Sequence, residues 1–493
     1  MNKRFKYWIS AGVLTGSVAL QACTDLNEQV FDTIPATQFG NTPAQQAAIL
    51  GPLYGNLRGF RGQMEDVNTV TDEQVVPTRG GDWKDGDNWR RRHQHTWNPT
   101  TDNDFFNGIW NFIYQGAVGI NRQLEGQTNA ALVAELRAFR AFYHYLALDY
   151  FGNAPIVDKF TTDLPKQATR AELYAFVERE LTQVLPNLST QVGGAMYGRF
   201  NQAAANAILA KLYLNAGVYT GTPQWQKCIE ACDRIIGNSA FSLETNFADN
   251  FTVNNQGSKE MVFAVPFDKS QGTGFVMQMK TLHYLSQLTY NLGSSPWNGF
   301  CTLADFYNSF DDKDARKKAT WIAGQQFTSA GVPILDDGQP LVFTPEIPAF
   351  EMPAGAPGRR AGVRMGKWQY EVGNPRNDMS NDWALYRLSD FVLMRGEANF
   401  RLGNVAKALE DINRIRTRAG VTPFTASMTL KDILDERGRE LAWEGWRRQD
   451  QIRFGTFDDP WQFKEASAPT RALFPIPQRQ LDGNPNLKQN PGY

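Results

Sequence analysis

The sequence predicts a mainly α-helical protein, folded as a single large domain with long irregular loops that carry short strands. Three observations lead to this fold class. Apolar residues recur at helical spacing in several long segments, strand-like alternation is brief, and stretches rich in Pro and Gly separate the two. The composition, 42% hydrophobic and 20% charged, is that of a globular chain with a substantial core.

Two helices are expected in the first half of the chain. Residues 132–151 carry apolar side chains at helical spacing, and a proline soon afterwards ends the segment. Residues 169–185 begin with Thr169 and have Glu172 three positions later, which is a capping-box pattern. The apolar positions of the first helix are Leu136, Phe139, Tyr143 and Leu146.

Two further segments have the form of helical hairpins. Residues 201–217 pair with 225–236 across a Gly-containing turn, and residues 385–402 pair with 405–419 across another. Small Ala residues stand where the paired helices would approach closely. The pattern resembles tetratricopeptide hairpins with irregular spacing. Such pairs bury their apolar faces against neighbours and make a rigid scaffold.

Between and before these pairs lie the loops. Residues 260–265 form a short β-rich run, and 282–335 mix short helical pieces with loops. Residues 344–366 are rich in Pro and Gly, so we expect them to be irregular and exposed. Residues 80–97 are rich in Trp and Gly. Long loops on a rigid base are the usual place for binding sites.

The N-terminus has the features of an export signal. Residues 1–22 combine basic residues with a short apolar stretch that is too short to span a membrane. The closing Leu-Gln-Ala-Cys resembles a lipobox, so cleavage ahead of Cys23 and a diacylglycerol on its thiol are expected. The alternative is an ordinary signal peptide followed by a chance cysteine. Residues 23–44 are then expected to be an extended, lipidated tether in which Pro43 is a breaker.

Charge and cysteine content exclude several classes of protein. With 50 basic and 51 acidic residues the chain lacks the basic excess typical of nucleic-acid binders, so no nucleic-acid partner is expected. After Cys23 only Cys228, Cys232 and Cys301 remain, too few for a disulfide-stapled scaffold. Cys228 and Cys232, four apart on an expected helix, are predicted to be small buried apolar residues.

A Trp-rich loop is the first candidate binding site. Trp83 and Trp89 stand among Asp, Asn and Gly residues, where burial is harder than on an apolar helix face. Trp faces can pack on the C–H face of a sugar, and Asp82 and Asn88 can accept or donate hydrogen bonds to its hydroxyls. The alternative is that these Trp side chains pin the loop to the scaffold.

Two other segments are candidates for the same role. Trp297 and Asn298 lie in a second loop, Ser-Pro-Trp-Asn-Gly-Phe, in which the Trp again stands among polar and Gly residues. Arg364, Trp368 and Tyr370 alternate along the chain, which predicts a strand with one exposed face and a ligand-facing Arg364.

Three carboxylates on one expected helix face are candidates for catalysis. Glu436, Glu440 and Glu444 share one face of an expected helix and could serve as a glycosidase acid and base. Arginines are interleaved with them, which favours a salt-bridged helix instead. We therefore predict no catalytic residues and no enzymatic activity.

Metal sites are not expected either. His93 and His95 lack the further ligands of a recognised zinc motif. Asp82, Asp85 and Asp87 do not keep the spacing of a calcium-binding EF-hand loop, so a structural calcium ion there is only a hypothesis. No cofactor and no metal ligand are predicted.

Several blocks in fixed order carry a family resemblance. The strongest is residues 436–455, with Arg437-Gly-Arg-Glu-Leu followed by Trp443-Glu-Gly-Trp-Arg and then Asp450-Gln-Ile-Arg-Phe-Gly. The C-terminal block, 473–493, contains Phe-Pro-Ile-Pro and ends in Asn-Pro-Gly-Tyr. Further blocks are residues 136–143, 150–155, 261–267 and 386–398. Together they resemble the SusD/RagB family of outer-membrane lipoproteins from Cys23 to the end of the chain.

The resemblance implies a fold and a setting. Members are α-helical with four tetratricopeptide-like units, lie on the outer face of the outer membrane, and cover a SusC-like TonB-dependent transporter. They bind glycans without catalysis, and some handle peptides. On this pattern residues 45–259 and 260–493 are expected to be N- and C-terminal regions packed as one globular unit.

The prediction is therefore a lipid-anchored, cell-surface binding protein that captures an oligo- or polysaccharide and passes it to a SusC-like transporter. One alternative keeps the fold but binds peptides or acts as a transporter lid, as RagB-like proteins would. A secreted hydrolase is a third hypothesis. The identity, linkage and length of the glycan cannot be read from the sequence.

Overall fold

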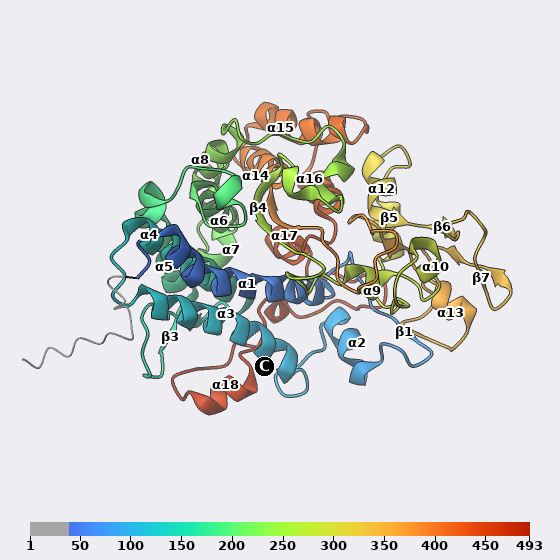
Figure 1. Ribbon diagram of the computed structural model, residues 1–493, viewed down its shortest axis with the longest axis horizontal. Helices are drawn as coiled ribbons and strands as arrows, with labels where there is room; N and C mark the ends of the chain where they lie inside the picture. Colours follow the sequence, from blue (N-terminus) through green and yellow to red (C-terminus); the bar gives the residue numbers. More distant parts are fainter. Residues whose placement is uncertain (1–38) are drawn as a thin grey trace, which may run out of the picture.

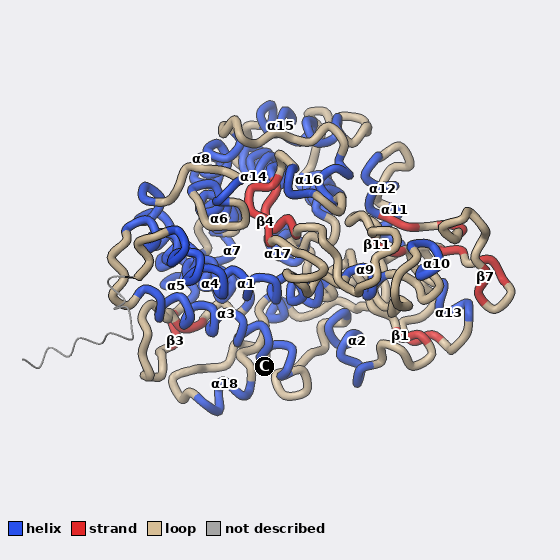
Figure 2. Tube along the Cα trace, in the orientation of Figure 1, coloured by secondary structure: helices blue, strands red, loops and turns tan. Residues whose placement is uncertain are grey.

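The computed structural model describes residues 39–493 and shows a mainly helical protein (Figure 1). Helices make up the left and upper parts of the molecule, while loops and short strands make up most of the right-hand part (Figure 2). The predicted fold class is confirmed. The signal peptide, Cys23 and most of the predicted tether lie outside the described residues.

The first half of the chain forms a row of packed helices. Helix α1 (Pro43–Asn68) packs on α3 (Asn103–Leu124), α3 packs on α4 (Ala130–Tyr150), and α4 packs on α5 (Arg170–Val184). Two of these, α4 and α5, are the helices predicted at residues 132–151 and 169–185.

Helix starts follow the local capping chemistry. Thr169 and Glu172 form the predicted capping box at α5. A second capping box, Thr42 with Gln45, starts α1, and Pro43 occupies its first turn, where a missing N–H costs nothing. Pro43 therefore begins a helix instead of breaking a tether, and the predicted extended segment ends earlier than residue 44.

The predicted hairpins are present. Helix α6 (Gln202–Leu214), followed by the short α7 (Ala216–Thr220), packs on α8 (Trp225–Ile236). Helix α14 (Leu388–Arg401) packs on both α15 (Val405–Arg418) and α8. The two hairpins thus form one continuous helical layer through the α8–α14 contact.

The main two-stranded sheet lies beside this layer. Strand β4 (Met261–Val265) pairs antiparallel with β12 (Trp383–Arg387), and every residue of both strands is buried. The predicted β-rich run at 260–265 is confirmed. The helix predicted from residue 385 begins instead at Leu388, because the preceding residues continue the strand, with Arg387 still in an extended conformation.

One core joins the two sequence regions. Phe200 stacks on Phe263 with ring centroids 4.7 Å apart. Arg448 donates a 2.9 Å hydrogen bond to the buried carboxylate of Asp149. Glycine is required where α3 meets α4, since a Cβ on Gly116 would lie 2.2 Å from the ring of Tyr143.

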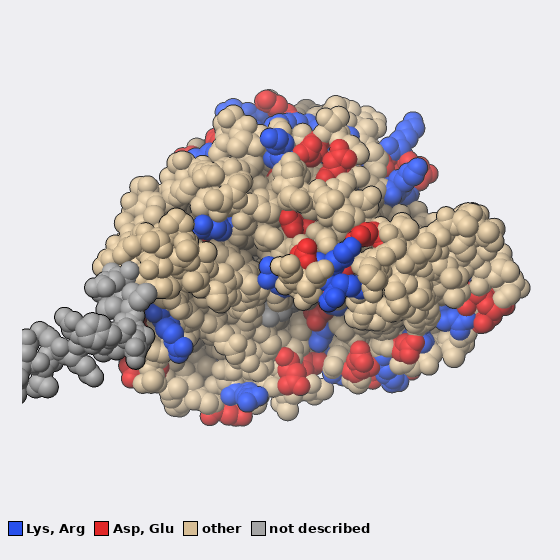
Figure 3. All heavy atoms as spheres, in the orientation of Figure 1, with Lys and Arg blue, Asp and Glu red and all other residues tan. Residues whose placement is uncertain are grey.

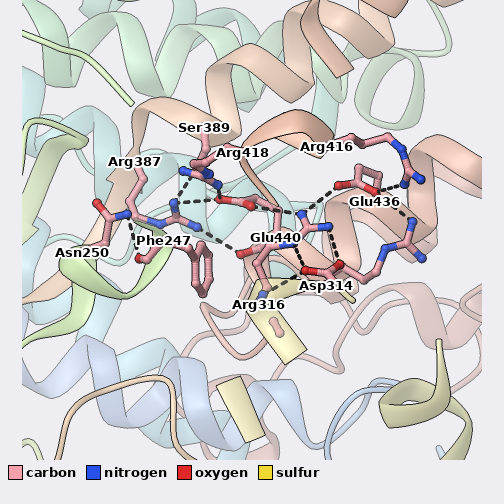
Figure 4. Close-up of polar contacts among 12 residues, drawn as sticks. Phe247, Asn250, Asp314, Arg316, Arg387, Ser389, Arg416, Arg418, Glu436 and Glu440 are labelled. Carbon is pink, nitrogen blue, oxygen red and sulfur yellow. Dashed lines mark hydrogen bonds and ion pairs between the residues drawn. The ribbon is translucent and has the colours of Figure 1, made fainter. Parts of the chain in front are cut away.

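A buried ionic network ties the C-terminal helices together (Figure 4). Arg387 pairs with Glu260, Glu440 and Glu444 at 2.7–3.0 Å, and all four side chains are almost fully buried. Arg316 pairs with Glu436 at 2.7 Å and extends the network. Further members are Arg416, Arg418, Arg439, Asp314 and Lys367. Helix α16 (Leu430–Leu441) is held to the scaffold in this way. Helix α17 (Arg447–Phe454) is held by a separate set of pairs, which includes Arg453 with Glu397 at 2.7 Å.

The right-hand part of the molecule consists of short elements. Residues 344–366 are irregular as predicted, but many of their side chains are buried, so their predicted exposure is wrong in part.

The short helices are α2 (Asn88–His93), α9 (Met277–Thr281), α10 (Ser286–Tyr290), α11 (Ala304–Asn308), α12 (Ala315–Thr320), α13 (Ala356–Arg360) and, elsewhere, α18 (Gln478–Gly483). The paired short strands are β1 (Thr78–Arg79) with β10 (Glu351–Met352), β2 (Ala154–Pro155) with β3 (Gln167–Ala168), β5 (Trp321–Ile322) with β11 (Arg364–Met365), β6 (Gly324–Gln325) with β9 (Val342–Phe343), and β7 (Leu335–Asp336) with β8 (Gln339–Pro340).

The cysteines and the surface agree with the sequence interpretation. Cys228, Cys232 and Cys301 are buried free thiols. Acidic and basic side chains are interspersed over the face seen in Figure 3. Over residues 39–493 we find no helix that is both long and apolar enough to cross a membrane.

Candidate ligand-binding site

Two of the predicted clusters meet in space. The indole N–H of Trp83 donates a 2.7 Å hydrogen bond to the main-chain carbonyl of Trp297. A solvent-open hollow of about 490 Å³ lies where the two loops join. It is lined by Asp82, Trp83, Asp85, Tyr284, Ser295, Pro296 and Trp297.

The ring of Trp83 is held by its neighbours. It packs over Gly299, where a Cβ would lie 2.3 Å from the indole, so only glycine fits. The ring of Phe300 lies 5.4 Å away and that of Trp89 lies 5.7 Å away at 61°. Trp83 stays half-buried and keeps part of its indole in the hollow. Trp297 is more open, with 39% of its surface exposed.

The backbone of both loops is locally unusual. Trp83, Asp85 and Asp87 have φ values of 64°, 37° and 62°, and Asn298 has 55°. Few non-glycine residues adopt this left-handed region, and such residues tend to gather at functional sites. The strained conformation turns the indole of Trp83 toward the second loop.

Ion pairs fix the outer side of the Trp-rich loop. Lys84 and Arg90 both pair with Glu351, at 2.9 and 2.6 Å. Glu351 belongs to β10, which pairs in parallel with β1 immediately before the loop. The loop is therefore held at its base and at its rim.

The polar groups of the hollow are already oriented. The hydroxyl of Tyr284 donates to the carboxylate of Asp82. The Ser295 hydroxyl donates to the main-chain carbonyl of Tyr284 at 2.9 Å. Burial, together with the Asp82 carboxylate, raises the pKa of Tyr284 to about 12, so the phenol remains a donor at neutral pH. The Asp85 carboxylate accepts the indole N–H of Trp89 at 2.7 Å.

The predicted ligand residues fall into two groups. Asp82, Trp83 and Trp297 line the hollow. Trp89 lies behind Trp83, between Phe300 at 5.3 Å and the guanidinium of Arg92 at 4.6 Å. Asn88 begins α2, and its side-chain oxygen accepts from Arg91. For these last two residues, the alternative of a loop-pinning role fits their contacts better.

Arg364 and Asn298 lie beneath the hollow. Arg364 is fully buried and donates a 2.7 Å hydrogen bond to the side-chain oxygen of Asn298, which is also buried. Arg364 also donates to the main-chain carbonyls of Arg359 and Ala361 at 2.8 Å. Burial, and the nearby charge of Arg79, lower the pKa of Arg364 to about 9.

The predicted exposed face of the strand at Arg364 is wrong. Trp368 and Tyr370 are buried like Arg364. The strand β11 pairs with β5, and the ring of Phe343 lies 4.8 Å from the Arg364 guanidinium. The strand ends at residue 365, so the predicted alternating strand does not reach Trp368 and Tyr370. Arg364 and Asn298 support the second loop from below.

One lining residue of the hollow lies outside both predicted loops. Tyr284 lies between the two loops in sequence, within a segment of ordinary composition two residues before α10. Only its contact with Asp82, which is 202 residues away, reveals its role. In the sequence, the only indication is that Tyr284 is an aromatic residue close to the second predicted loop.

The carboxylates of the helix α16 region serve the ionic network. Glu436 and Glu440 are fully buried and Glu444 nearly so. Burial alone would raise the pKa of Glu436, but the charges of Arg316 and Arg439 outweigh it and hold the value at about 2. Such a group cannot donate a proton at neutral pH. The predicted salt-bridged helix is confirmed.

The histidines are engaged in the fold. His93 contacts the main-chain carbonyl of Gln462 at 2.8 Å, and His95 contacts that of Val70 at 2.9 Å. Burial lowers the pKa of His93 to about 4. Within residues 39–493, no three His, Cys, Asp or Glu side chains are grouped as a metal site would require. The calcium hypothesis stays untested.

A larger hollow lies elsewhere and holds none of the predicted residues. Its volume is about 570 Å³, and it is formed by α3, the loop between β2 and β3, and α18. Trp110 and Tyr114 lie on its helical wall, and Leu164 on the loop. Its lining also combines aromatic rings with carboxylates, but it adds two lysines, Lys159 and Lys166. We take the hollow at Trp83 and Trp297 as the candidate site because it is the one that brings two sequence-predicted loops together.

The fold and this hollow define a class of protein: a mainly helical scaffold whose long loops form an open hollow lined in part by aromatic side chains. Two parts of the chain match models of known protein families. Residues 354–493 match the model described as "SusD family", and residues 38–214 match the model described as "Starch-binding associating with outer membrane". The chain belongs to the SusD/RagB family.

Individual relatives extend over most of the chain. It is 29% identical over 416 residues to the starch-binding protein SusD of Bacteroides thetaiotaomicron, which is 75% of each chain. A SusD-like protein of Formosa agariphila is 24% identical over 433 residues, 79% of each chain.

Solved structures share the fold. Surface glycan-binding protein A from Bacteroides thetaiotaomicron, in complex with laminarihexaose, has a TM-score of 0.74 at 21% identity, covering 91% of this chain and 99% of the other. A laminarin-binding SusD-like protein has the same TM-score at 23% identity and the same coverage.

Proposed function

We propose that this protein binds a glycan at the hollow between Trp83 and Trp297 and does not cleave it. The observation that carries the proposal is the combination of exposed indole surface with carboxylates and hydroxyls in one open depression. Indole faces pack on the C–H face of a sugar ring, and the oxygens of Asp82 and Asp85 can accept hydrogen bonds from its hydroxyls.

The relatives support this function. One is named a starch-binding protein, and two proteins of the same fold are named for glycan or laminarin binding. The carboxylates that could have suggested hydrolysis are locked in the ionic network, and the paired carboxylates of the hollow are engaged with Tyr284 and Trp89. These features favour capture without chemistry.

We place this binding at the outer surface of the outer membrane, with delivery to a SusC-like transporter. The lipobox at Cys23, the family membership and the family description "associating with outer membrane" support the location. An open site suits the task, since a ligand bound with modest affinity can be released to the transporter. Replacing Cys23 with Ala should release the protein from the membrane fraction, and unchanged membrane attachment would overturn the lipid-anchor proposal.

The central test is binding by the soluble protein from Thr24 onward. Affinity gels or calorimetry with a panel of polysaccharides, including starch and laminarin, should identify at least one ligand. The double variant Trp83→Ala, Trp297→Ala should lose it while keeping its circular dichroism spectrum. Leu335→Ala, at an exposed position on β7 outside the hollow, is the matched control and should bind normally.

Other outcomes would redirect the proposal. If no polysaccharide binds and a peptide library does, the peptide-binding alternative replaces it. Glycan binding that survives the double change would keep the function and move the site, with the larger hollow at Trp110 as the next place to test.

A further inference from the structure

We infer that the hollow selects neutral glycans and discriminates against acidic ones such as uronates and sulfated sugars. This inference rests on the proposed glycan-binding function and concerns the same site. It comes from the charges that face the hollow. Among the described residues that line it, the charged side chains are the carboxylates of Asp82 and Asp85, and both residues are exposed to solvent. The phenol of Tyr284 also lines the hollow and is neutral, since its pKa is raised to about 12.

The two carboxylates are positioned as acceptors. Asp82 receives the hydroxyl of Tyr284, and Asp85 receives the indole N–H of Trp89. Each of these contacts uses part of the acceptor capacity of a carboxylate, which has about four lone-pair sites. The remaining capacity is free for sugar hydroxyls, which are donors. A sugar carboxylate or sulfate offers only acceptors at neutral pH and would meet like charge.

The nearby cations do not offset this charge. Lys84 and Arg90 are both directed to Glu351 on β10. Arg91 is held by Asp102 at 2.9 Å. The guanidinium of Arg92 lies over the rings of Trp89 and Phe105. None of these four side chains is part of the lining of the hollow.

The arginines beneath the hollow are also occupied. Arg79 donates to the carbonyl of Ala361 at 2.9 Å, and Arg364 donates to main-chain carbonyls and Asn298. Arg359 pairs with Asp336 and Asp337. Both Arg79 and Arg364 are buried, so neither offers an N–H to a ligand in the hollow. Over residues 39–493, the lining of the hollow presents two carboxylates and no guanidinium or ammonium group.

The test compares polymers that differ only in charge. Starch or laminarin, whichever binds, is lightly oxidised so that some C6 hydroxymethyl groups become carboxylates, and a portion of the product is converted to the methyl ester. The ester lacks the same hydroxyls as the acid but carries no charge. At low ionic strength we expect the acid to bind at least tenfold more weakly than the ester. Added salt should narrow the gap, because it screens exposed charges.

A variant links the effect to one residue. Asp82→Asn keeps the size of the side chain and an oxygen acceptor for Tyr284 but removes the charge. It should bring the affinities for acid and ester closer together, whereas Glu465→Gln, at an exposed position outside the hollow, should not. Equal binding of the acid and the ester to the wild-type protein, whether strong or weak, overturns the inference. Failure of both unmodified polymers, and of the rest of the panel, would instead overturn the proposed function.

Discussion

The indole N–H of Trp83 donates a 2.7 Å hydrogen bond to the main-chain carbonyl of Trp297, across 214 residues of sequence. This contact makes the two loops of the binding hollow depend on each other. The donor is a side chain and the acceptor is backbone. Changes at Trp83 should therefore disturb both walls, while Trp297→Ala removes only the exposed ring.

The first prediction follows from this asymmetry. Trp83→Phe keeps an aromatic ring but deletes the indole N–H, so the hydrogen bond to the main-chain carbonyl of Trp297 is lost. A net hydrogen bond is worth about 1 kcal/mol, which corresponds to roughly a fivefold loss of glycan affinity. Calorimetry with the bound glycan measures it. Trp225→Phe, on α8 and outside the hollow, should leave the affinity unchanged, and a similar loss there would point to a general effect of the substitution.

The second prediction concerns the packing of the Trp83 ring against Gly299. In Gly299→Ala the new methyl group would lie 2.3 Å from the indole, so the ring must leave its place. We expect glycan affinity to fall at least tenfold and Trp fluorescence to shift toward that of a more solvent-exposed indole.

A glycine with open space around it provides the control. At Gly257 a Cβ would have no neighbour within 4 Å, so Gly257→Ala should change neither fluorescence nor binding. Normal affinity in Gly299→Ala would show that the ring position of Trp83 does not matter for the ligand.

The third prediction tests the support beneath the hollow. Arg364→Met removes the donors to the side-chain oxygen of Asn298 and to the main-chain carbonyl of Gly362. The carbonyls of Arg359 and Ala361 keep a second donor each, from Asn298 and Arg79. Buried polar groups left without partners cost about 1–3 kcal/mol each, partly offset here because an unfavourably buried charge is also removed. We expect a loss of about 2 kcal/mol in unfolding free energy by urea denaturation, together with weaker glycan binding. Arg479→Met, at an exposed position, should change neither quantity.

The helical part of the fold could be predicted because its evidence is local. Thr169 and Glu172 stand next to the helix they cap, and the segment 225–236 carries its own apolar periodicity. The start of helix α1 is not predicted, because Pro43 considered alone indicates a break in the chain. A proline in a first turn and a proline that ends a helix look alike unless the capping residues Thr42 and Gln45 are considered with it.

The site was only half predictable for a related reason. Each Trp-rich loop could be recognised by its own composition, but their meeting depends on the fold of the chain between them. Tyr284 has no local pattern that distinguishes it. Arg364 shows the opposite error, since the local alternation predicted an exposed strand face, whereas the strand is only two residues long and Arg364 is buried. Composition indicates which side chains could bind, and tertiary packing decides which of them remain accessible.

The fourth prediction concerns the ionic network. Burial would raise the pKa of Glu440, but Arg418, Arg387 and Arg316 outweigh it and hold the pKa well below its usual value. Glu440→Gln would leave these guanidinium groups without their shared counter-charge. Breaking a buried ion pair on one side costs about 3–5 kcal/mol, which urea denaturation at pH 7 can measure.

The same network should respond to acid. The folded-state pKa values of Glu440 and Glu436 lie below the unfolded value of 4.5, so their contribution is complete above about pH 4.5 and is lost as the pH falls toward the folded-state values. In Glu440→Gln, part of this acid sensitivity should disappear. The exposed pair of Lys431 with Asp435 is the control, and Asp435→Asn should cost less than about 0.5 kcal/mol. Equal costs for the two variants would contradict the role assigned to the network.

The fifth prediction is a pH dependence of opposite sign at Glu73. This side chain is fully buried, and one of its oxygens accepts the main-chain N–H of Trp443 at 3.0 Å. Burial raises its pKa from 4.5 to about 8, against the opposing charge of Arg447. Between these values the unfolded chain releases a proton that the folded chain keeps. The group therefore lowers the free energy of unfolding progressively as pH rises from about 4.5 to about 8.

Glu73→Gln should remove that penalty, because an amide preserves the acceptor and has no charge to bury. We expect the variant to be more stable than the wild type by more than about 1 kcal/mol at pH 8 and by little at pH 5. Urea denaturation at the two pH values measures the difference, with the exposed Glu465→Gln as the matched control. A stability difference that is the same at both pH values would mean that Glu73 is ionised in the folded protein, and that Arg447 compensates its charge despite burial.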